Sequence, residues 1–522
     1  MIRQAFLLLT IWLTTTAYGG EIIVREGESL HHALRKVREW RRTNSPQCQG
    51  GITIRIQKGR YYMQEPLFLR PEDSGTLSSP TRIVGEQGTV ICGDPMQKHA
   101  QLWPLPGKEA PSDTVVMERM LAFDPVARTI TIPTPPVSVR QIITSALRAE
   151  NLEMIVHQRW AIAILRVRTL TEHDGSTIVT FREPESRLEF EHPWPQPVIG
   201  GERGNSSFLL RTTEQRDGIE QLVVVDGASY VSFEGITFEN TCWNRPLHKG
   251  HVTLQGGFPI VDAYKLAVPG LPWDSDLENQ AWVERPVSAV TVRNANHVVF
   301  TSCGFRHLGA TALDYADNIS DCKVTLCSFM DIGGTAIMGG SFAESPLEVH
   351  RPYGDLAKRC QRLTIDTNTI QDISREDWGA VAISLGYVRD CVVSNNRLDK
   401  MNYSGICIGW GWTPLYTGME DNHIVGNKVE NYARQLYDAG GIYTLSNQPN
   451  SSIRNNEIGK PYPAHYATNH RGFPIYLDAR TDGFTIENNR TYAFGGSSAN
   501  SHPIRRDEIG DNHPGPNIIF KQ

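Results

Sequence analysis

The chain has 522 residues, of which 40% are hydrophobic and 21% are charged. This composition is typical of a globular protein that buries one large core or two to three ordinary ones. The formal net charge is -6 at pH 7 and no block of Lys and Arg occurs. A nucleic-acid partner, which requires a basic face, is therefore not expected, whereas a neutral substrate is compatible with the charge.

The N-terminal stretch MIRQAFLLLTIWLTTTAYGG predicts a secretory signal peptide over residues 1–19. Arg3 is followed by an apolar run from Ala5 to Leu13, and small residues lead to Gly19. No cysteine follows at a lipoprotein position, and no later segment reaches the roughly 18 apolar residues that a membrane span needs. We therefore expect a secreted or periplasmic protein without a membrane span.

Residues 20–99 are expected to form a cap and the first coils of a solenoid. The segment SLHHALRKVREWRR, from Ser29 to Arg42, carries its apolar residues on one helical face behind a serine N-cap, which predicts a helix that closes the end of the core. GITIRIQKGRYYM and TRIVGEQGTVICG then read as short strands. Residues 100–215 lose this register among Pro-rich turns, and they predict an inserted β-rich subdomain.

A six-residue pattern repeats through residues 216–522: an apolar residue, two variable ones, a special residue, a variable one and an apolar one. Copies include FEGITF, FTSCGF, VTLCSF, IDTNTI, VSNNRL, IVGNKV and IRNNEI, and the later copies recur about every 30 residues. The segments between them are rich in Ile, Val, Thr, Tyr and Phe and are punctuated by Gly and Asn. Short strands at this period predict an all-β protein whose main domain is a right-handed parallel β-helix.

The special position of the repeat holds asparagine in successive copies, at Asn368, Asn396, Asn427, Asn456 and Asn489. Stacked coils would place these amides above one another, where they can bond along the axis and satisfy the backbone of the turn. The sequence therefore predicts an asparagine ladder. Cys303 and Cys327 occupy the same column and are expected to be small buried residues.

The cysteine content indicates free thiols and no metal centre. The nine cysteines are an odd number, so at least one thiol should be unpaired. Neither CxxC nor HExxH spacing occurs. We therefore expect no metal site and no cofactor.

The last coils are rich in the two residue types that carbohydrate chemistry uses. Aromatic rings stack on the apolar faces of sugars, and hydrolysis of a glycosidic bond needs two carboxyl groups. Asp478 continues the apolar strand IYL, where β-propensity disfavours aspartate, so it is a functional candidate. The expected substrate-binding residues are Glu376, Asp377, Trp378, Trp410, Trp412, Tyr443, Arg471 and Tyr476. For Tyr443 and Tyr476, simple stacking from coil to coil is an equal alternative.

Two pairs of carboxylates are compatible with the register of the coils. On straight strands Asp438 and Asp478 would lie more than about 20 Å apart. That pair therefore requires a sharp bend at Gly440 and Gly441. Asp377 and Asp438 would lie two coils apart, a gap of about 10 Å, near the upper limit for an inverting glycosidase. Residue spacing leaves both pairs open, and with them retention or inversion.

The runs EDWGAVAISLGY, YSGICIGWGWT, DAGGIYTLSNQPNSSIRNNEI and IYLDARTDGFTIENN resemble the exported bacterial β-helix proteins of glycoside hydrolase family 141. The resemblance covers roughly residues 220 to 495. It implies α-L-fucosidase or xylanase activity on plant cell-wall polysaccharides, with two catalytic aspartates. These correspond to Asp438, which precedes GGIYTL, and to Asp478 in IYLD.

We therefore predict a monomeric glycoside hydrolase with a carbohydrate substrate. Two alternatives remain on the same fold. A polysaccharide lyase would need a basic residue, and often Ca²⁺, to neutralise a uronate. A non-catalytic protein would bind carbohydrate without turning it over.

Overall fold

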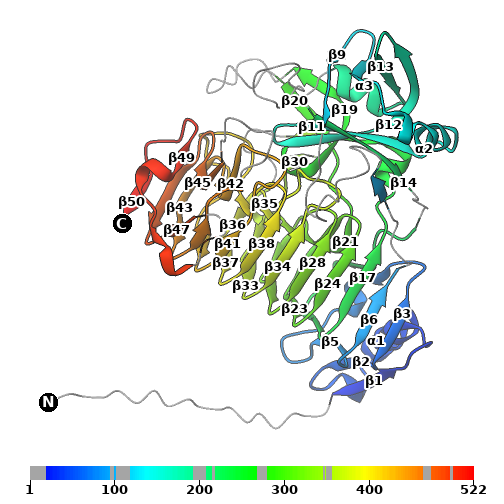
Figure 1. Cartoon of the computed structure of the whole chain (residues 1–522). Helices are drawn as coiled ribbons and strands as arrows, with labels where there is room; N and C mark the ends of the chain where they lie inside the picture. The colour runs from blue at the N-terminus through cyan, green and yellow to red at the C-terminus, as the bar shows by residue number, and fades with distance from the viewer. Residues whose placement is uncertain are drawn as a thin grey trace.

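The structure is a computed structural model that describes residues 19–93, 99–101, 118–191, 207–213, 218–266, 279–344, 347–348, 355–462, 472–493, 496 and 498–521. Most of the chain winds into a right-handed parallel β-helix, and a second β-sheet domain sits against one side of it (Figure 1). The fold class predicted from the repeat is therefore confirmed. Arg471 and the predicted signal peptide, up to residue 18, lie outside the described residues.

Three sheets of stacked strands form the wall of the β-helix. Within the described residues, a 12-stranded sheet runs from β1 (Gly20–Val24) to β50 (Ile519–Lys521), an 11-stranded sheet from β3 (Gly59–Tyr62) to β48 (His502–Pro503), and a 10-stranded sheet from β4 (Leu67–Leu69) to β49 (Gly510–Asp511). The 10-stranded sheet carries the candidate site. Its consecutive later strands are β21 (Ser288–Arg293), β25 (Thr311–Tyr315), β29 (Ile337–Gly339), β35 (Ile383–Leu385), β39 (Ile406–Ile408), β42 (Ala439–Thr444) and β45 (Gly472–Leu477).

Side chains of the 10-stranded sheet alternate between the inside and the outside of the β-helix. Ile406, Ile442 and Ile475 pair in register and are fully buried in the interior core. Tyr443 and Tyr476, each the next residue on its strand, belong to a separate cluster on the outer face. The period of two residues in a strand accounts for this division. A residue that directly follows an interior isoleucine, as Tyr443 and Tyr476 do, therefore faces outward.

The asparagine ladder predicted from the repeat is present. The Oδ1 atom of Asn427 accepts hydrogen bonds from the backbone N–H and the Nδ2 of Asn396, at 3.0 and 2.9 Å. The same two bonds, at 2.8 and 3.0 Å, join Asn427 to Asn456. Cys303 and Cys327 are buried in this column, and all nine cysteines are free thiols. The ladder satisfies buried backbone groups that no strand partner reaches.

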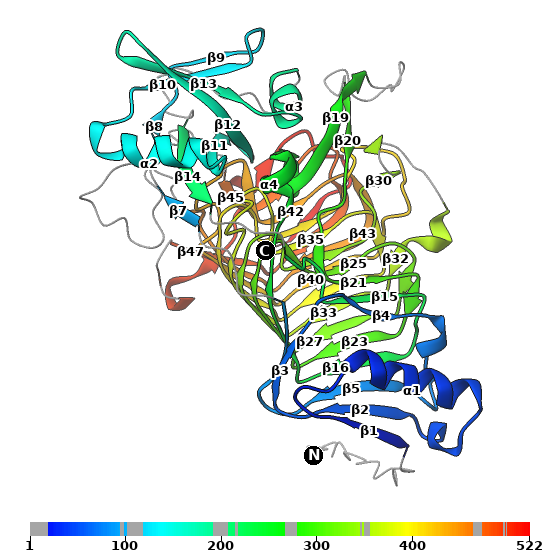
Figure 2. The ribbon, with the colours of Figure 1, turned by 90° about the vertical axis from the view of Figure 1, so that its right-hand side faces the viewer.

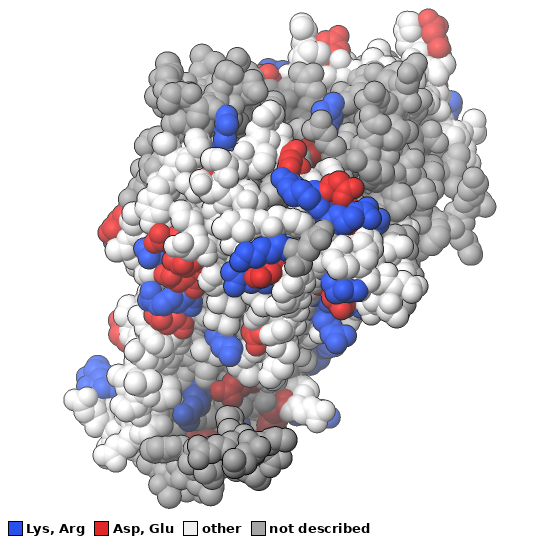
Figure 3. Space-filling model, turned by 90° about the vertical axis from the view of Figure 1, so that its left-hand side faces the viewer, with Lys and Arg blue, Asp and Glu red and all other residues white. Residues whose placement is uncertain are grey.

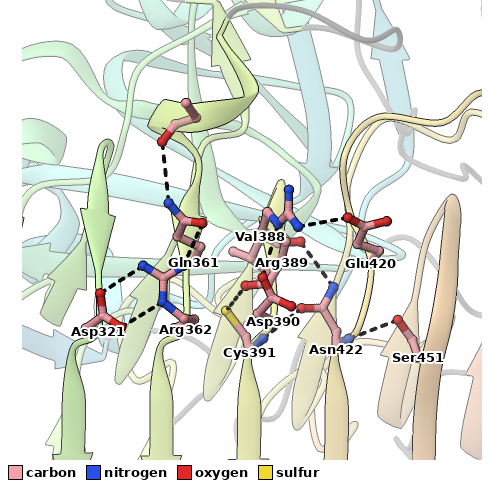
Figure 4. A network of polar contacts seen from close by, with 11 residues as sticks. Asp321, Gln361, Arg362, Val388, Arg389, Asp390, Cys391, Glu420, Asn422 and Ser451 are labelled. Atoms are coloured by element: carbon pink, nitrogen blue, oxygen red, sulfur yellow. Dashed lines mark hydrogen bonds and ion pairs between the residues drawn. The ribbon is translucent and has the colours of Figure 1, made fainter.

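A second polar column joins the turns that lead into the 12-stranded sheet (Figure 4). Arg362 donates two hydrogen bonds, of 2.7 and 2.8 Å, to the carboxylate of Asp321. Asn422 accepts from the backbone N–H of Cys391 at 3.2 Å and donates its own backbone N–H to Ser451 at 3.1 Å. On the face drawn in Figure 3, basic and acidic side chains are likewise interspersed. These contacts run from coil to coil, so their role is to hold the stack together.

The helix α1 (Leu30–Arg42) closes the N-terminal end of the interior, as predicted from its apolar face (Figure 2). The Oγ of Ser29 accepts a hydrogen bond from the backbone N–H of His32 at 3.3 Å and so caps the helix. Leu34 and Val37 are buried against the first coil. Among the described residues, no helix is long and apolar enough to cross a membrane.

A second sheet covers the outer face of the 10-stranded sheet. Its main path is β30 (Ala343–Glu344), β31 (Leu347–Glu348), β20 (Asn279–Val283), β19 (Phe258–Leu266), β18 (His251–Leu254), β12 (Ala161–His173), β11 (Leu152–Gln158), β14 (Ser207–Thr213) and β7 (His99–Gln101). Segments far apart in the chain thus share one sheet. Its apolar side chains pack with Phe342, Trp410, Tyr443 and Tyr476 of the β-helix, so this domain forms a roof over the outer face.

The region that the sequence predicts to be β-rich also contains two helices, α2 (Val137–Arg148) and α3 (Glu185–Glu191). Helix α2 buries Val139, Ile143 and Ala146, which are spaced at helical intervals and form one face against the second sheet. These helices add to the strands of the region that the sequence predicts to be β-rich. The helical spacing was hidden among β-branched residues that favour strands.

Candidate active site

Asp438 and Asp478 occupy opposite ends of two neighbouring strands. Asp438 immediately precedes β42 and has a positive φ of 63°, whereas Asp478 immediately follows β45. The two strands pair in register, with Tyr443 beside Tyr476. Asp478 is buried and Asp438 is half-buried, so both lie beneath the outer surface.

The strand that follows Asp438 has a kink at Gly440. A Cβ atom at this position would lie only 2.6 Å from the carbonyl oxygen of Ile442, closer than an extended strand allows. The strand still pairs with β45 in one register from Ala439 to Thr444. The bend that the sequence predicts at the glycines is therefore a local kink within β42.

Two tyrosines join the carboxylates crosswise. The hydroxyl of Tyr476, from the strand that ends at Asp478, donates a hydrogen bond of 3.0 Å to Oδ1 of Asp438. The hydroxyl of Tyr443, from the strand that begins after Asp438, donates to Oδ2 of Asp478. The two rings meet edge to face with centroids 5.1 Å apart. Nδ2 of Asn512 donates a further hydrogen bond of 2.5 Å to Oδ1 of Asp478.

Gln255 links this pair of tyrosines to a third. Its Nε2 donates to the hydroxyl oxygens of Tyr403 and Tyr443, at 2.8 and 2.9 Å. The hydroxyl of Tyr403 in turn donates to the backbone carbonyl of Asp438 at 3.0 Å. A carbonyl can only accept, so the Tyr403 proton is committed there, and the Gln255 amide must supply the donor. The second N–H of Gln255 leaves Tyr443 free to direct its own proton to Asp478.

The tyrosines of this network keep their protons. Burial, followed by the charge of Asp478, raises the pKa of Tyr443 well above its ordinary value. Burial, followed by the charge of Asp438, does the same to the pKa of Tyr403. Both carboxylates act on both phenols, which places the two aspartates in one electrostatic environment. The tyrosines are therefore hydrogen-bond donors throughout the working pH range.

The roof domain holds the segment that leads to Asp438. The end of β11 and the turn that follows it contact this segment. Nε2 of His157, in β11, lies 2.9 Å from the carbonyl oxygen of Gln435. The backbone N–H of Tyr437 donates to the carbonyl of Arg159, in the turn, at 3.2 Å. Burial raises the pKa of Tyr437 to about 12 against the opposing charge of Arg159. The position of Asp438 thus depends on a domain that lies far away in the sequence.

Glu376, Asp377 and Trp378 lie apart from this network. Glu376 forms an ion pair of 2.9 Å with Arg211 of the roof domain. Asp377 accepts a hydrogen bond of 2.8 Å from Nε2 of His251. Trp378 is 4% exposed and packs in the interior core, which is the environment of a core residue.

Trp410 and Trp412, the other two predicted tryptophans, lie on the outer face beneath the roof domain. Trp410 packs against Phe258 and Phe342, each with ring centroids 5.2 Å away, and is 4% exposed. Trp412 meets Trp410 edge to face at 4.9 Å and is only partly buried. Of the predicted aromatic residues other than the tyrosines, Trp412 is the one whose ring is left partly open.

Several residues of the site were missed in the sequence. Gln255 and His157 belong to segments that carry no repeat, and Asn512 lies beyond the final ladder strand. Tyr403 could have been found, because it precedes the strand GICIGW as Asp438 precedes GGIYTL. His251 carried no signal, since its partner Asp377 is more than 120 residues away in the chain.

The outer face of the β-helix, covered by a second sheet, holds two carboxyl groups, which is the number that glycoside hydrolysis needs. The comparisons with known proteins agree. A family model for the GH141 insertion domain matches residues 91–217, and one for the right-handed β-helix region matches residues 356–506. A solved structure titled "Glycoside hydrolase" is 30% identical, covers 96% of both chains and has a TM-score of 0.82. The chain belongs to the glycoside hydrolases. Residues 91–217 match the insertion domain of family 141.

Two further solved structures are more distant. The complex of XylC with xylose is 10% identical over 96% of this chain and 86% of its own, with a TM-score of 0.37. The catalytic domain of a GH87 α-1,3-glucanase in complex with tetrasaccharides is 10% identical over 96% of this chain and 68% of its own, with a TM-score of 0.33. No curated protein matches the chain.

Proposed function

We propose that this glycoside hydrolase acts on a plant cell-wall or similar polysaccharide, with fucosidase- or xylanase-like specificity, and that Asp438 and Asp478 carry the reaction. The observation that carries the proposal is the network in which Tyr443 and Tyr476 each bind the carboxylate at the far end of the partner strand. Glycoside hydrolysis needs two carboxyl groups that share one site but differ in protonation. The network supports such a pair.

The hydrogen bonds favour different roles for the two aspartates. Asp478 is buried and accepts from Tyr443 and from Asn512, so both of its oxygens are held in place. We assign Asp478 as the base or nucleophile. Asp438, which is half-buried at the bend, is then the acid that protonates the leaving oxygen.

Product analysis tests the reaction class. Purified protein is incubated with xylan, fucosylated xyloglucan and pectic polysaccharides, and new reducing ends are measured. A hydrolase releases reducing sugar without the ultraviolet absorbance of an unsaturated uronate. That absorbance would identify a lyase, and binding without either signal would identify a non-catalytic protein.

Substitution tests the residues. Asp438→Asn and Asp478→Asn should each lower kcat by at least about 1,000-fold on the polysaccharide while the thermal midpoint is preserved. Asp482→Asn is the matched control, because Asp482 is bound to Asn517 outside the network. Full activity in both Asn variants would reject the assignment.

Leaving-group dependence separates the two roles. A dinitrophenyl glycoside needs little acid assistance, so Asp438→Asn should recover most of its activity on this substrate, whereas Asp478→Asn should not. The reverse pattern would exchange the roles of the two aspartates.

We also propose that residues 1–19 direct export. In its native host, the mature protein should appear outside the cytoplasm, in the periplasm or medium, with its N-terminus near Gly20. A full-length cytoplasmic product would contradict this.

A further inference from the structure

A cavity of about 280 Å³ lies between the roof domain and the β-helix, beside the candidate active site. One wall comes from residues 243–259 and 284–287. The floor comes from turns of three successive coils, around Gly309, Gly333 and Asp377. This volume is at the lower end for ligand pockets and suits one small molecule.

The cavity lies along the helix axis from Asp438. Its floor turns lead into β25, β29 and β35, and β42 follows β35 by two strands. At the spacing of paired strands, two steps are about 10 Å. Gly256 and Gly257 line the cavity, and the preceding residue, Gln255, holds the tyrosines of the active site. One short segment therefore borders both places.

His251 gives the cavity wall an unused hydrogen-bonding atom. The side chain is 1% exposed, its Nε2 bonds to Asp377, and its Nδ1 has no hydrogen-bond partner within the described residues. Asp377 also accepts, through Oδ1, from the backbone N–H of Gly379 at 3.0 Å, so its side chain acts as an acceptor here. Nε2 therefore carries the proton, and Nδ1 is an acceptor that calls for a donor. Burial lowers the pKa of His251, which keeps the ring neutral.

The rest of the lining mixes donors, acceptors and an aromatic ring. The indole of Trp243 meets His251 edge to face, with centroids 4.6 Å apart. Arg245 pairs with Glu284 at 2.6 Å, and its Nε has no partner within the part of the chain that the structure describes. Lys249 lies exposed among the lining residues. The carboxylates of the lining would repel an anionic ligand, and Arg245 and Lys249 would repel a cationic one.

A hydroxyl group satisfies all of these atoms, because it donates to Nδ1 or a carboxylate and accepts from a guanidinium or an ammonium. An indole beside such groups suits the apolar face of a sugar ring. We propose that this cavity binds one neutral sugar residue of the substrate, two coils from Asp438. That the sugar belongs to the substrate rests on the proposed function.

Binding is tested on the full chain carrying Asp478→Asn, so that no turnover intervenes. Saturation-transfer NMR is run with the probes D-xylose, L-fucose, D-galactose and D-galacturonate. At least one neutral sugar should bind, and His251→Gln should raise its Kd about fivefold or more, because Gln can keep the bond to Asp377 but lacks the Nδ1 acceptor. His173→Gln, an exposed histidine at a distant hairpin, is the matched control.

His251→Gln could weaken binding through a folding defect, so a second variant is needed. Lys249 is exposed, so Lys249→Met should fold normally. This variant should also weaken binding of the sugar. A neutral sugar that binds equally to all variants, a preference for D-galacturonate, or no neutral binding overturns the inference. On the polysaccharide, His251→Gln should raise KM more than it lowers kcat. Failure of the proposed function would appear separately, as retained turnover in Asp438→Asn and Asp478→Asn.

Discussion

Each carboxylate of the candidate pair is held by a tyrosine that belongs to the other strand. Tyr443 follows the bend after Asp438 and reaches Asp478, while Tyr476 precedes Asp478 and reaches Asp438. Hydrogen bonds that involve a charged group are about twice as strong as neutral ones. The tyrosines thus connect two residues that their strands place at opposite ends.

The first prediction concerns Tyr443. Tyr443→Phe removes a donor to Asp478, and kcat should fall by about 10- to 100-fold. The measurement is kcat on an active polysaccharide, with thermal melting of the variant beside it.

Tyr315→Phe is the control for this substitution. Tyr315 is a buried tyrosine whose hydroxyl donates to the backbone carbonyls of Val298 and Lys323, at 3.4 and 3.3 Å. Tyr315→Phe should lose some stability but keep the wild-type kcat. An unchanged kcat in Tyr443→Phe would show that this hydroxyl does not support the reaction.

At the scale of a strand, the bend at Gly440 decides where Asp438 points. Gly440→Ala would place a Cβ 2.6 Å from the carbonyl of Ile442 and 3.1 Å from Cβ of Tyr476. The backbone must shift, and a displacement of about 1 Å can cost about 100-fold in rate. We expect kcat to fall by this order with a modest loss of stability.

Gly304→Ala provides the comparison, because its nearest contact is a threonine side chain at 3.2 Å that can adjust. Steady-state kinetics on both variants decide the matter. Equal activity of the two would mean that the bend tolerates a side chain.

The ladder is the second feature at this scale. Asn427→Ala leaves the buried backbone N–H of Asn396 without its acceptor and removes a side-chain bond on either side. The free energy of unfolding should fall by about 2 kcal/mol or more. Arg397→Ala, on an exposed strand position of the preceding coil, should change it by less than about 0.5 kcal/mol. Urea denaturation measures both, and similar midpoints would show that water replaces the ladder amide.

At the scale of the whole molecule, the roof domain determines whether the site is formed. It covers the outer face, contributes His157 and the carbonyl of Arg159 to the segment before Asp438, and packs against Trp410. The β-helix alone offers a long exposed sheet. The enclosed site exists only where the two domains meet.

His157→Ala tests this dependence. It removes the contact with the carbonyl of Gln435, so Asp438 should lose its fixed position and kcat should fall about 10-fold or more. His173→Ala, an exposed histidine of the same domain, should leave activity unchanged. Kinetics together with thermal melting separate a local effect from unfolding of the domain. Wild-type activity in His157→Ala would place the control of Asp438 within the β-helix.

The sequence by itself determined the β-helix, the capping helix and the ladder. Each depends on a pattern that recurs at a fixed spacing, so Asn396 and Asn427 could be aligned without coordinates. The two aspartates were found for a related reason, because each adjoins a repeated strand.

Only the tertiary structure decided what surrounds them. Gln255, His157 and His251 come from segments without a repeat, and their partners lie more than 100 residues away in the chain. The burial of Trp378 likewise depends on core residues that come from distant parts of the chain. A linear pattern encodes the distance between neighbouring coils, but it does not encode where an inserted domain folds back, because that is set by packing between surfaces that have no common period.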